Sequence, residues 1–214
     1  MRPLEIIYED GDCVAVNKPS GLLTMPGRGG AAGEKNLKAL LSASGRPAFV
    51  VHRLDRDASG LILFARNEKA HRHLSLLFET REIGKKYLAA VDGLILENRG
   101  EVDKPLQAYG SGRMGVGFDG KPSVTRYAVL ERYKRATLLE VELITGRRHQ
   151  IRAHMYYIKH PVLGDALYGD RKRQAAFPRL MLHSYSLEFR DAGGRRRLLK
   201  AEPPNDFVSV LPFL

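Results

Sequence analysis

The sequence predicts an α+β fold built on a mixed, mostly antiparallel sheet. Short apolar runs of strand length outnumber the stretches with helical periodicity. Strands and helices do not alternate regularly, as a doubly wound parallel sheet would require. The 214 residues, of which 43% are hydrophobic, can bury a sizeable core. We therefore expect residues 1–214 to form a single domain.

The chain should begin with a β-hairpin. Residues 4–8 and 13–18 are strand-like runs joined at Asp10-Gly11, a dipeptide that favours tight turns. Residues 19–33 are rich in glycine and contain two prolines, which indicates a long exposed loop. Loops of this length are often functional.

Two helices and a buried strand should follow. Residues 36–42 can form a short helix, and residues 60–65 are a continuous apolar run of strand length. Asn67 is a suitable N-cap for a surface helix over residues 67–82, in which apolar residues recur at helical spacing.

The second half of the chain is dominated by predicted strands. These cover residues 87–91, 124–131, 137–144, 180–190 and 197–201. Between the first two, residues 109–120 contain many glycines and should form a hairpin or loop that can touch a ligand through Arg113. Residues 151–158 have helical spacing and end before Pro161, which predicts a short helix.

The net charge of +11 favours a polyanionic partner, because lysine and arginine neutralise phosphates and release counterions. A merely solubilising charge is the alternative. No apolar run approaches the roughly 20 residues that span a bilayer, and the N-terminus lacks a secretory pattern. The single cysteine, Cys13, lies in an apolar stretch and should be buried. We expect a cytoplasmic protein without a membrane partner.

Two segments concentrate charged and hydrogen-bonding side chains. Residues 52–55 (HRLD) place a carboxylate and an arginine before a core strand, and residues 145–154 (TGRRHQIRAH) cluster arginine and histidine at the start of a short helix. A neighbouring guanidinium keeps a carboxylate ionised, as a nucleophile or a base requires. A plain structural salt bridge is the simpler interpretation of the same residues.

A metal site is the rival chemical hypothesis, with His52, Asp55, His149 and His154 as ligands. The two later histidines are five residues apart, so a helix does not bring them onto one face as an i, i+4 pair. The glycines of residues 27–33 likewise do not match a nucleotide-binding loop. We expect neither a metal nor a cofactor.

The motifs resemble those of the RluA family of pseudouridine synthases. Residues 52–60 (HRLDRDASG) are similar to the family signature H-R-L-D-x-x-T-S-G. Residues 16–21 (VNKPSG), 85–87 (KKY) and 145–152 (TGRRHQIR) are similar to three further motifs, in the family's order. The related RsuA branch would have glycine in place of His52. Ala58 departs from the usual threonine, which leaves the carboxylate in place.

The resemblance implies the pseudouridine synthase fold, one catalytic domain without an S4 RNA-binding domain, and no cofactor. It implies that Asp55 is the catalytic aspartate, that Arg147 is its ion-pair partner, and that Tyr87 packs against the target base. Leu143 and Ile144 would then supply an apolar wall of the uracil pocket.

The resemblance also implies a structured RNA partner, either ribosomal or transfer RNA, bound by a monomer. Arg53 matches a position that holds the RNA while the base is flipped. We extend the predicted RNA-binding set by four neighbouring polar or basic residues: His52, Lys86, Arg148 and Arg152. Further candidate phosphate contacts are Arg28, Arg171, Lys172 and Arg173.

The proposed reaction would need no metal, nucleotide or redox thiol. An ionised Asp55 can attack C1′, attack C6 or remove the 2′ proton, and the sequence does not choose among these. Tyr87 can stack on the base or relay the C5 proton. A non-catalytic RNA-binding or ribosome-assembly protein with the same fold is the second hypothesis.

Overall fold

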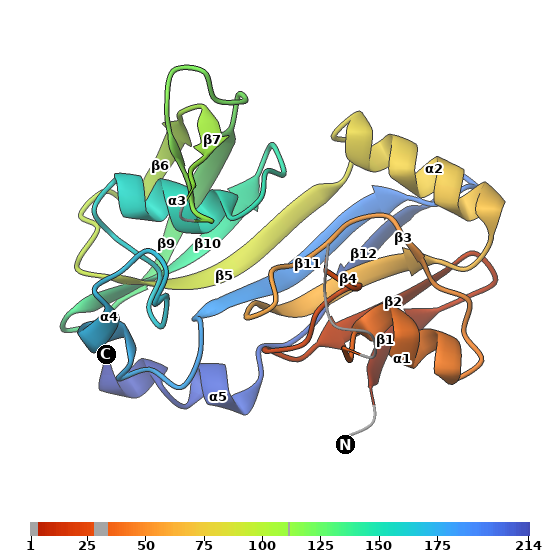
Figure 1. Cartoon of the computed structure of the whole chain (residues 1–214), viewed down its shortest axis with the longest axis horizontal. Coiled ribbons are helices and arrows are strands. Elements are labelled where there is room, and N and C mark those ends of the chain that lie inside the picture. Colours follow the sequence, from red (N-terminus) through yellow and green to blue (C-terminus); the bar gives the residue numbers. More distant parts are fainter. Residues whose placement is uncertain (1–3, 28–33, 111) are drawn as a thin grey trace. The chain divides into compact units, whose positions relative to one another are not determined.

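The computed structural model describes residues 4–27, 34–110 and 112–214 (Figure 1). The chain divides into two compact units. Unit 1 comprises Met1–Gly84 and Ser184–Glu202, and unit 2 comprises Lys85–His183 and Pro203–Leu214. Each unit has its own group of paired strands. The predicted α+β class with a mostly antiparallel sheet is confirmed, and the single catalytic domain stays a prediction.

The sheet of unit 1 has the order β1-β2-β4-β11, with β12 on β11 and β3 on β4. The pairs β1–β2, β2–β4, β3–β4 and β11–β12 are antiparallel. The strands are β1 (Glu5–Glu9), β2 (Cys13–Lys18), β3 (Phe49–Val50), β4 (Ser59–Ala65), β11 (Leu182–Arg190) and β12 (Arg196–Lys200). The expected hairpin is therefore present, and the carboxylate of Asp10 closes its turn by accepting from the backbone N–H groups of Asp12 and Cys13, both at 2.8 Å.

Two helices of unit 1 begin where the sequence predicts. Asn36 caps α1 (Leu37–Ala43), and Asn67 caps α2 (Glu68–Glu79) by accepting from the backbone N–H of Ala70 at 2.8 Å. An asparagine cap satisfies one of the four N–H groups that a helix start leaves without a partner. The buried residues of α2 lie on one face, as the helical spacing predicts.

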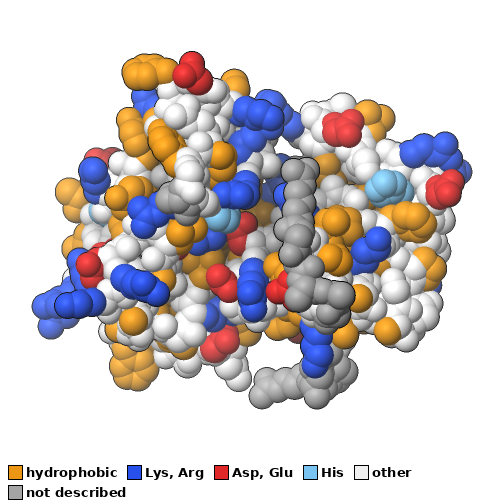
Figure 2. All heavy atoms as spheres, in the orientation of Figure 1, with side chains coloured by type: hydrophobic (Ala, Val, Ile, Leu, Met, Phe, Trp, Pro, Cys, Tyr) orange, Lys and Arg blue, Asp and Glu red, His pale blue; other side chains and the backbone are white. Residues whose placement is uncertain are grey.

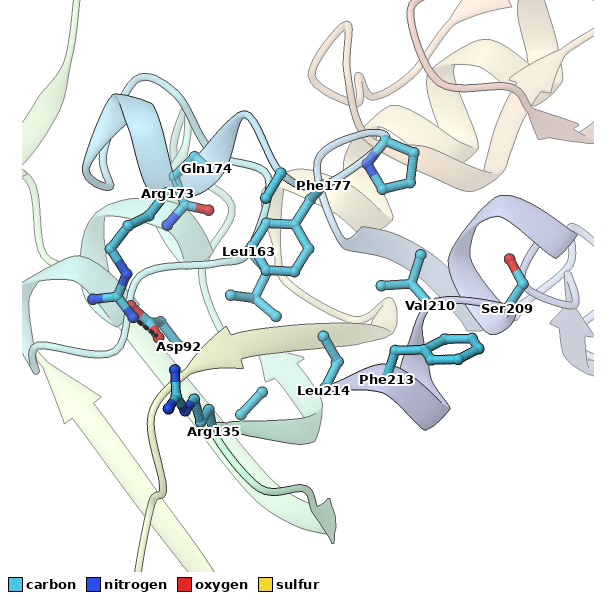
Figure 3. Close-up of a pocket in the computed structure, with 13 residues that line it drawn as sticks. Asp92, Arg135, Leu163, Arg173, Gln174, Phe177, Ser209, Val210, Phe213 and Leu214 are labelled. Carbon is cyan, nitrogen blue, oxygen red and sulfur yellow. Dashed lines mark hydrogen bonds and ion pairs between the residues drawn. The ribbon is translucent and has the colours of Figure 1, made fainter.

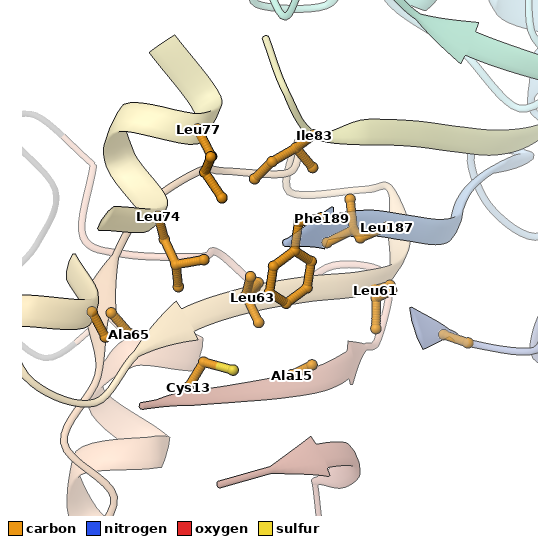
Figure 4. Close-up of a cluster of buried hydrophobic side chains, with 12 residues drawn as sticks. Cys13, Ala15, Leu61, Leu63, Ala65, Leu74, Leu77, Ile83, Leu187 and Phe189 are labelled. Carbon is orange, nitrogen blue, oxygen red and sulfur yellow. The ribbon is translucent and has the colours of Figure 1, made fainter. Parts of the chain in front are cut away.

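The core of unit 1 lies between α2 and the sheet (Figure 4). Leu74 and Leu77 of the helix point toward Leu63 of β4 and Phe189 of β11. Cys13 belongs to this cluster, and burial raises the pKa of its thiol to about 12. The expected packing role of the cysteine is confirmed, because a buried, protonated thiol is unreactive.

Unit 2 is built on the strand order β5-β10-β9-β6, with every neighbouring pair antiparallel. These strands are β5 (Gly84–Asp92), β6 (Arg99–Asp103), β9 (Val124–Arg132) and β10 (Ala136–Leu143). A separate hairpin joins β7 (Leu106–Ala108) to β8 (Met114–Val116). It falls in the glycine-rich region where a hairpin or loop was expected.

The helical segments of unit 2 are short. They are α3 (Gln150–Tyr157), α4 (Arg171–Gln174), α5 (Asn205–Val208) and a 3₁₀ turn at Leu211–Phe213. Only α3 was expected from the sequence. A buried cluster of Leu106, Ala153 and Tyr168 packs α3 against the β7–β8 hairpin. This packing determines where the arginine-rich segment before α3 lies in unit 2.

Candidate active site

Asp55 lies in the connection between β3 and β4 of unit 1. Because Val50 and Phe64 are register partners, residues 51–58 must turn back within a short distance. Asp55 is half-buried and has no regular secondary structure around it. Of its two neighbours in the chain, Leu54 is buried and Arg56 is exposed.

Two side chains hold the segment before Asp55. The buried hydroxyl of Thr24 is within 3.3 Å of both the N–H and the carbonyl oxygen of Leu54, so it can accept from one and donate to the other. His52 Nε2 accepts from the N–H of Leu63 at 2.9 Å, and its ring stacks on Phe78 with centroids 4.5 Å apart. His52 therefore has a structural role in unit 1, while its predicted RNA contact stays a prediction. Arg53, beside it, is exposed.

Lys18 holds the segment after Asp55. Its side chain is completely buried, and Nζ donates to the carbonyl oxygens of Pro19, Leu22 and Arg56 at 3.0, 2.8 and 2.9 Å. A buried ammonium is costly unless its donors are used, and here three carbonyl oxygens face it. The lysine thus ties the end of β2 to the residue that follows Asp55.

Arg147 lies in the short segment between β10 and α3 of unit 2. It is half-buried, its N–H donates to Gln150 Oε1 at 3.0 Å, and its Nε donates to the carbonyl oxygen of Pro122 at 3.4 Å. His149, two residues later, has the left-handed φ of 52° and no side-chain capping bond. The segment is therefore shaped by hydrogen bonds to Gln150 and Pro122 rather than by regular helix geometry.

Tyr87 lies on β5 of unit 2, opposite Val141 of β10. Its side chain is buried. Lys86 is exposed on the same strand, and its Nζ is 2.7 Å from Glu140 Oε1. Leu143 ends β10 and Ile144 follows it, and both are half-buried. In unit 2 the predicted base-pocket residues therefore lie directly before the arginine-rich segment.

Arg148 and Arg152, both predicted to bind RNA, have different environments. Arg148 is exposed, and its guanidinium donates to the carbonyl oxygen of Gly112 in the β7–β8 hairpin. Arg152 is buried and donates through Nε and Nη2 to Asp165, at 2.7 and 2.9 Å. The guanidinium of Arg152 is therefore paired with a carboxylate inside unit 2, and its predicted RNA contact stays a prediction.

Asp165 and Tyr168 are site-neighbouring residues that sequence reasoning missed. The guanidinium carbon of Arg152 lies 5.1 Å from the centroid of the Tyr168 ring, and the Tyr168 hydroxyl is 3.1 Å from His149 Nδ1. The same hydroxyl accepts from the N–H of Met114 at 2.8 Å. No periodicity around these two residues indicates such contacts, so only the tertiary structure finds them.

The candidate phosphate contacts outside the motifs, and Arg113 of the glycine-rich region, have different environments. Arg171, Lys172 and Arg173 are exposed on α4, and Arg173 Nη2 lies 2.9 Å from Asp92. Arg113 lies with its guanidinium carbon 5.9 Å from the Tyr168 ring centroid. Arg28 lies outside the described residues.

The metal hypothesis finds little support in the contacts of its two later histidines. His149 contacts Tyr168, and both ring nitrogens of His154 have partners, Thr125 and the Lys104 carbonyl oxygen. Within the described residues there is no group of three or more metal-ligating side chains. Over the same residues, no helix is long and apolar enough to cross a membrane.

A pocket of about 590 Å³ opens in unit 2 (Figure 3). Neither the H-R-L-D segment nor the arginine-rich segment before α3 lines it. Leu163, Phe177 and Phe213 contribute apolar surface, and the Asp92–Arg173 ion pair lies at one end. Of the residues predicted to contact RNA, Arg173 lines it, and the predicted catalytic residues of the described chain do not.

Comparison with known proteins places these motifs in a family context. A family model described as RNA pseudouridylate synthase matches residues 12–157. The chain is 38% identical to ribosomal large subunit pseudouridine synthase D of Haemophilus ducreyi, over 99% of this chain and 71% of that protein. Against the protein of the same name from Buchnera aphidicola, identity is 40% over 86% of this chain and 64% of the relative.

A solved structure agrees with the sequence relatives. Human RNA pseudouridylate synthase domain containing 1 is 26% identical, with a TM-score of 0.82 over 97% of this chain and 89% of the human one. The matched family segment contains all three residues predicted to be catalytic.

Proposed function

The chain belongs to the RNA pseudouridylate synthase family, and from this we propose that it isomerises uridines in structured ribosomal RNA with Asp55 as the catalytic carboxylate. The family assignment makes the chain an RNA-modifying isomerase. The observation that carries the rest is the location of the H-R-L-D segment. It falls inside the matched region, and the half-buried Asp55 is held between the anchors Thr24 and Lys18.

The anchors explain how a connection without regular secondary structure can carry a catalytic group. Thr24 fixes the residue before Asp55, and Lys18 fixes the carbonyl oxygen of the residue after it. A catalytic group must be held within a fraction of an ångström of its productive position, because small displacements reduce the rate strongly. The half-buried carboxylate is thus held in place through its two neighbours.

The reaction needs no external reactant. The bond from N1 of uracil to C1′ of the ribose breaks, the base turns, and a bond from C5 to C1′ forms. C5 loses its proton and N1 gains one, so atoms and charge balance. A target within folded RNA must first be extruded from its stack, at a cost of a few kcal/mol. The resemblance gives Tyr87 and Arg147 roles in this reaction, and we propose those roles for them.

Ribosomal RNA is favoured as the substrate by the relatives named ribosomal large subunit pseudouridine synthase D. The net charge of +11 suits binding of a large polyanion. In Figure 2, Lys and Arg side chains are spread over much of the visible face rather than gathered in one patch. Exposed Arg53, Arg148 and the basic residues of α4 are the described members from which we expect phosphate contacts.

The test compares Asp55→Asn with Asp57→Asn. Asp57 is exposed two residues later and provides a matched control for the loss of one carboxylate in the same segment. We expect Asp55→Asn to abolish pseudouridine formation in ribosomal RNA while RNA affinity is retained, and Asp57→Asn to remain active. An active Asp55→Asn variant would contradict the assignment.

The substrate is tested separately, by mapping pseudouridines in ribosomal and transfer RNA from a deletion strain and its parent. Loss of a site in ribosomal RNA supports the proposal. Loss confined to transfer RNA would leave the reaction in place and change the substrate. An unchanged map in both RNAs would instead favour the non-catalytic RNA-binding hypothesis.

A further inference from the structure

The side-chain amide of Gln150 joins three segments of unit 2. It is buried, and its Nε2 donates to the carbonyl oxygen of Val124 and to Thr125 Oγ1, both at 2.9 Å. Its Oε1 accepts from the hydroxyl of Thr145 at 2.7 Å and from the N–H of Arg147 at 3.0 Å. Both donors and both acceptor positions of the amide are therefore used.

A second set of hydrogen bonds fixes the direction of these contacts. His154 is fully buried, and its Nε2 lies 3.0 Å from the Lys104 carbonyl oxygen, which can only accept. Nε2 must carry the proton, so in the neutral ring Nδ1 accepts from the hydroxyl of Thr125 at 2.8 Å. The Thr125 oxygen then accepts from Gln150, which fixes the amide orientation of Gln150.

We call these connected side chains the Gln150 network. Its members are Thr125, Thr145, Gln150 and His154, with the Lys104 carbonyl oxygen as the terminal acceptor. Because these side chains are buried, the loss of any one of these hydrogen bonds would cost free energy by leaving a polar group unsatisfied away from water. The network therefore has one preferred arrangement rather than several.

The segment that contains Arg147 depends on this arrangement. It connects β10 to α3 without a side-chain cap at the helix start, and His149 has a left-handed backbone. The N–H of Arg147 donates to the network rather than to a neighbouring strand. A shift of the Gln150 amide would therefore move the backbone from which the guanidinium of Arg147 extends.

We propose that the Gln150 network is a positioning device that sets the backbone of Arg147 for the isomerisation, with Thr125 and Gln150 as positioning residues. The proposal rests on the proposed role of Arg147 in the reaction. It extends that role to two buried residues on β9 and α3 that touch neither the base nor the ribose in this proposal.

The test removes one hydroxyl from the network and then restores it. Thr125→Val keeps the side-chain shape but breaks the link between His154 and Gln150, whereas Thr125→Ser keeps the hydroxyl. For Thr125→Val we expect kcat to fall about 10-fold or more, because small displacements of a catalytic group are costly. KM and RNA affinity should change little, and Thr125→Ser should recover most of kcat.

The matched control is Thr137→Val. Thr137 is also fully buried in unit 2, and its hydroxyl makes two hydrogen bonds, from the N–H of Ile95 at 3.1 Å and to the carbonyl oxygen of Gly93 at 2.9 Å. It lies at the opposite end of β10 from Arg147. Thr137→Val should therefore lose comparable stability while kcat stays near that of the wild type, at a temperature where all variants are folded.

A second readout follows the Arg147 amide directly. Amide hydrogen exchange at Arg147 should become faster in Thr125→Val and stay unchanged in Thr137→Val, because only the first variant loosens its acceptor. If Thr125→Val matches Thr137→Val in both kcat and exchange, or if Thr125→Ser fails to recover kcat, the network does not position Arg147.

Arg147→Met, assayed beside these variants, separates the two proposals. If Arg147→Met is inactive while Thr125→Val is not impaired, the positioning proposal fails and the proposed role of Arg147 stands. If Arg147→Met keeps full activity, the role of Arg147 fails first, and the positioning proposal falls with it.

Discussion

Arg152 and Asp165 form a buried ion pair in which two guanidinium nitrogens donate to the two carboxylate oxygens, at 2.7 and 2.9 Å. The carboxylate also accepts from the backbone N–H groups of Leu167 and Tyr168. The pair thus fixes α3 to the segment that carries Tyr168. Removal of the Asp165 carboxylate would leave the buried guanidinium of Arg152 without its anionic partner.

Asp165→Asn should lower the free energy of unfolding by about 3 to 5 kcal/mol, the usual cost of removing one partner of a buried ion pair. Chemical denaturation measures the loss. The control is Glu101→Gln, which breaks the exposed Arg126–Glu101 pair and should be nearly neutral, because water and salt screen exposed charges. Equal losses of unfolding free energy in the two variants would show that the buried Arg152–Asp165 pair contributes no more than an exposed pair.

Lys18→Met should destabilise unit 1 by about 3 kcal/mol or more, because three carbonyl oxygens lose their shared donor. Lys38 is exposed, so Lys38→Met is the control for losing one lysine and should be nearly neutral. Denaturation curves of both variants give the comparison. A stable Lys18→Met protein would show that the three carbonyl oxygens find water instead.

Gly60→Ala should destabilise the chain for two separable reasons. Gly60 has the positive φ of 109°, and an added Cβ would collide with the backbone of Ser184. Gly45 has a φ of 76° but open space around the Cβ position. Gly45→Ala should therefore cost only the backbone strain of about 1 to 2 kcal/mol, and Gly60→Ala clearly more. Thermal unfolding of the two variants separates strain from collision.

Stability should fall below about pH 6.5 through His154, because burial lowers the pKa of its imidazole from that value. The unfolded chain then binds a proton that the folded chain resists, so unfolding is favoured as the pH falls from 6.5 through the folded pKa. Above pH 6.5 this contribution is fully present. Unfolding free energies of the wild type and His154→Gln across this range give the measurement. The same slope in both would exclude His154 as its source.

Arg171→Glu with Lys172→Glu should weaken RNA binding and reduce its salt dependence, since each lost phosphate contact lowers the slope of log K against log salt by about 0.7 to 0.9. The control reverses two exposed lysines of unit 1, Lys38 and Lys69, for the same change in net charge. If both double variants bind alike, net charge rather than α4 determines affinity. Filter binding at several salt concentrations measures the slopes.

Much of the fold could be predicted because its signals are local. Asparagine caps at Asn36 and Asn67 and the Asp10 turn act within a few residues, so sequence periodicity and turn chemistry find them. β6, with the sequence RGEVD, has a single large apolar residue and gives no such signal. Its pairing with β9 comes from tertiary contacts.

In the candidate site, too, the features set by neighbouring residues could be predicted and those set by tertiary contacts could not. The motifs make Asp55, Tyr87 and Arg147 candidates because each lies in a short run of residues that resembles a family motif. They cannot tell that Arg152 is buried against Asp165, since the partner lies 13 residues later without a pattern between them. The burial of an arginine in such a motif is set by tertiary contacts, which the motif does not contain.

The ammonium group of Lys18 is buried and cannot contact a polyanion at the protein surface. At least four of the 35 lysine and arginine side chains are less than 10% exposed: Lys18, Lys85, Arg152 and Arg179. Such cations cannot displace counterions from a phosphate chain, although each adds to the formal charge of +11. The effective valence of the surface toward RNA is therefore smaller than composition suggests, and counterion release should be reckoned from exposed cations alone.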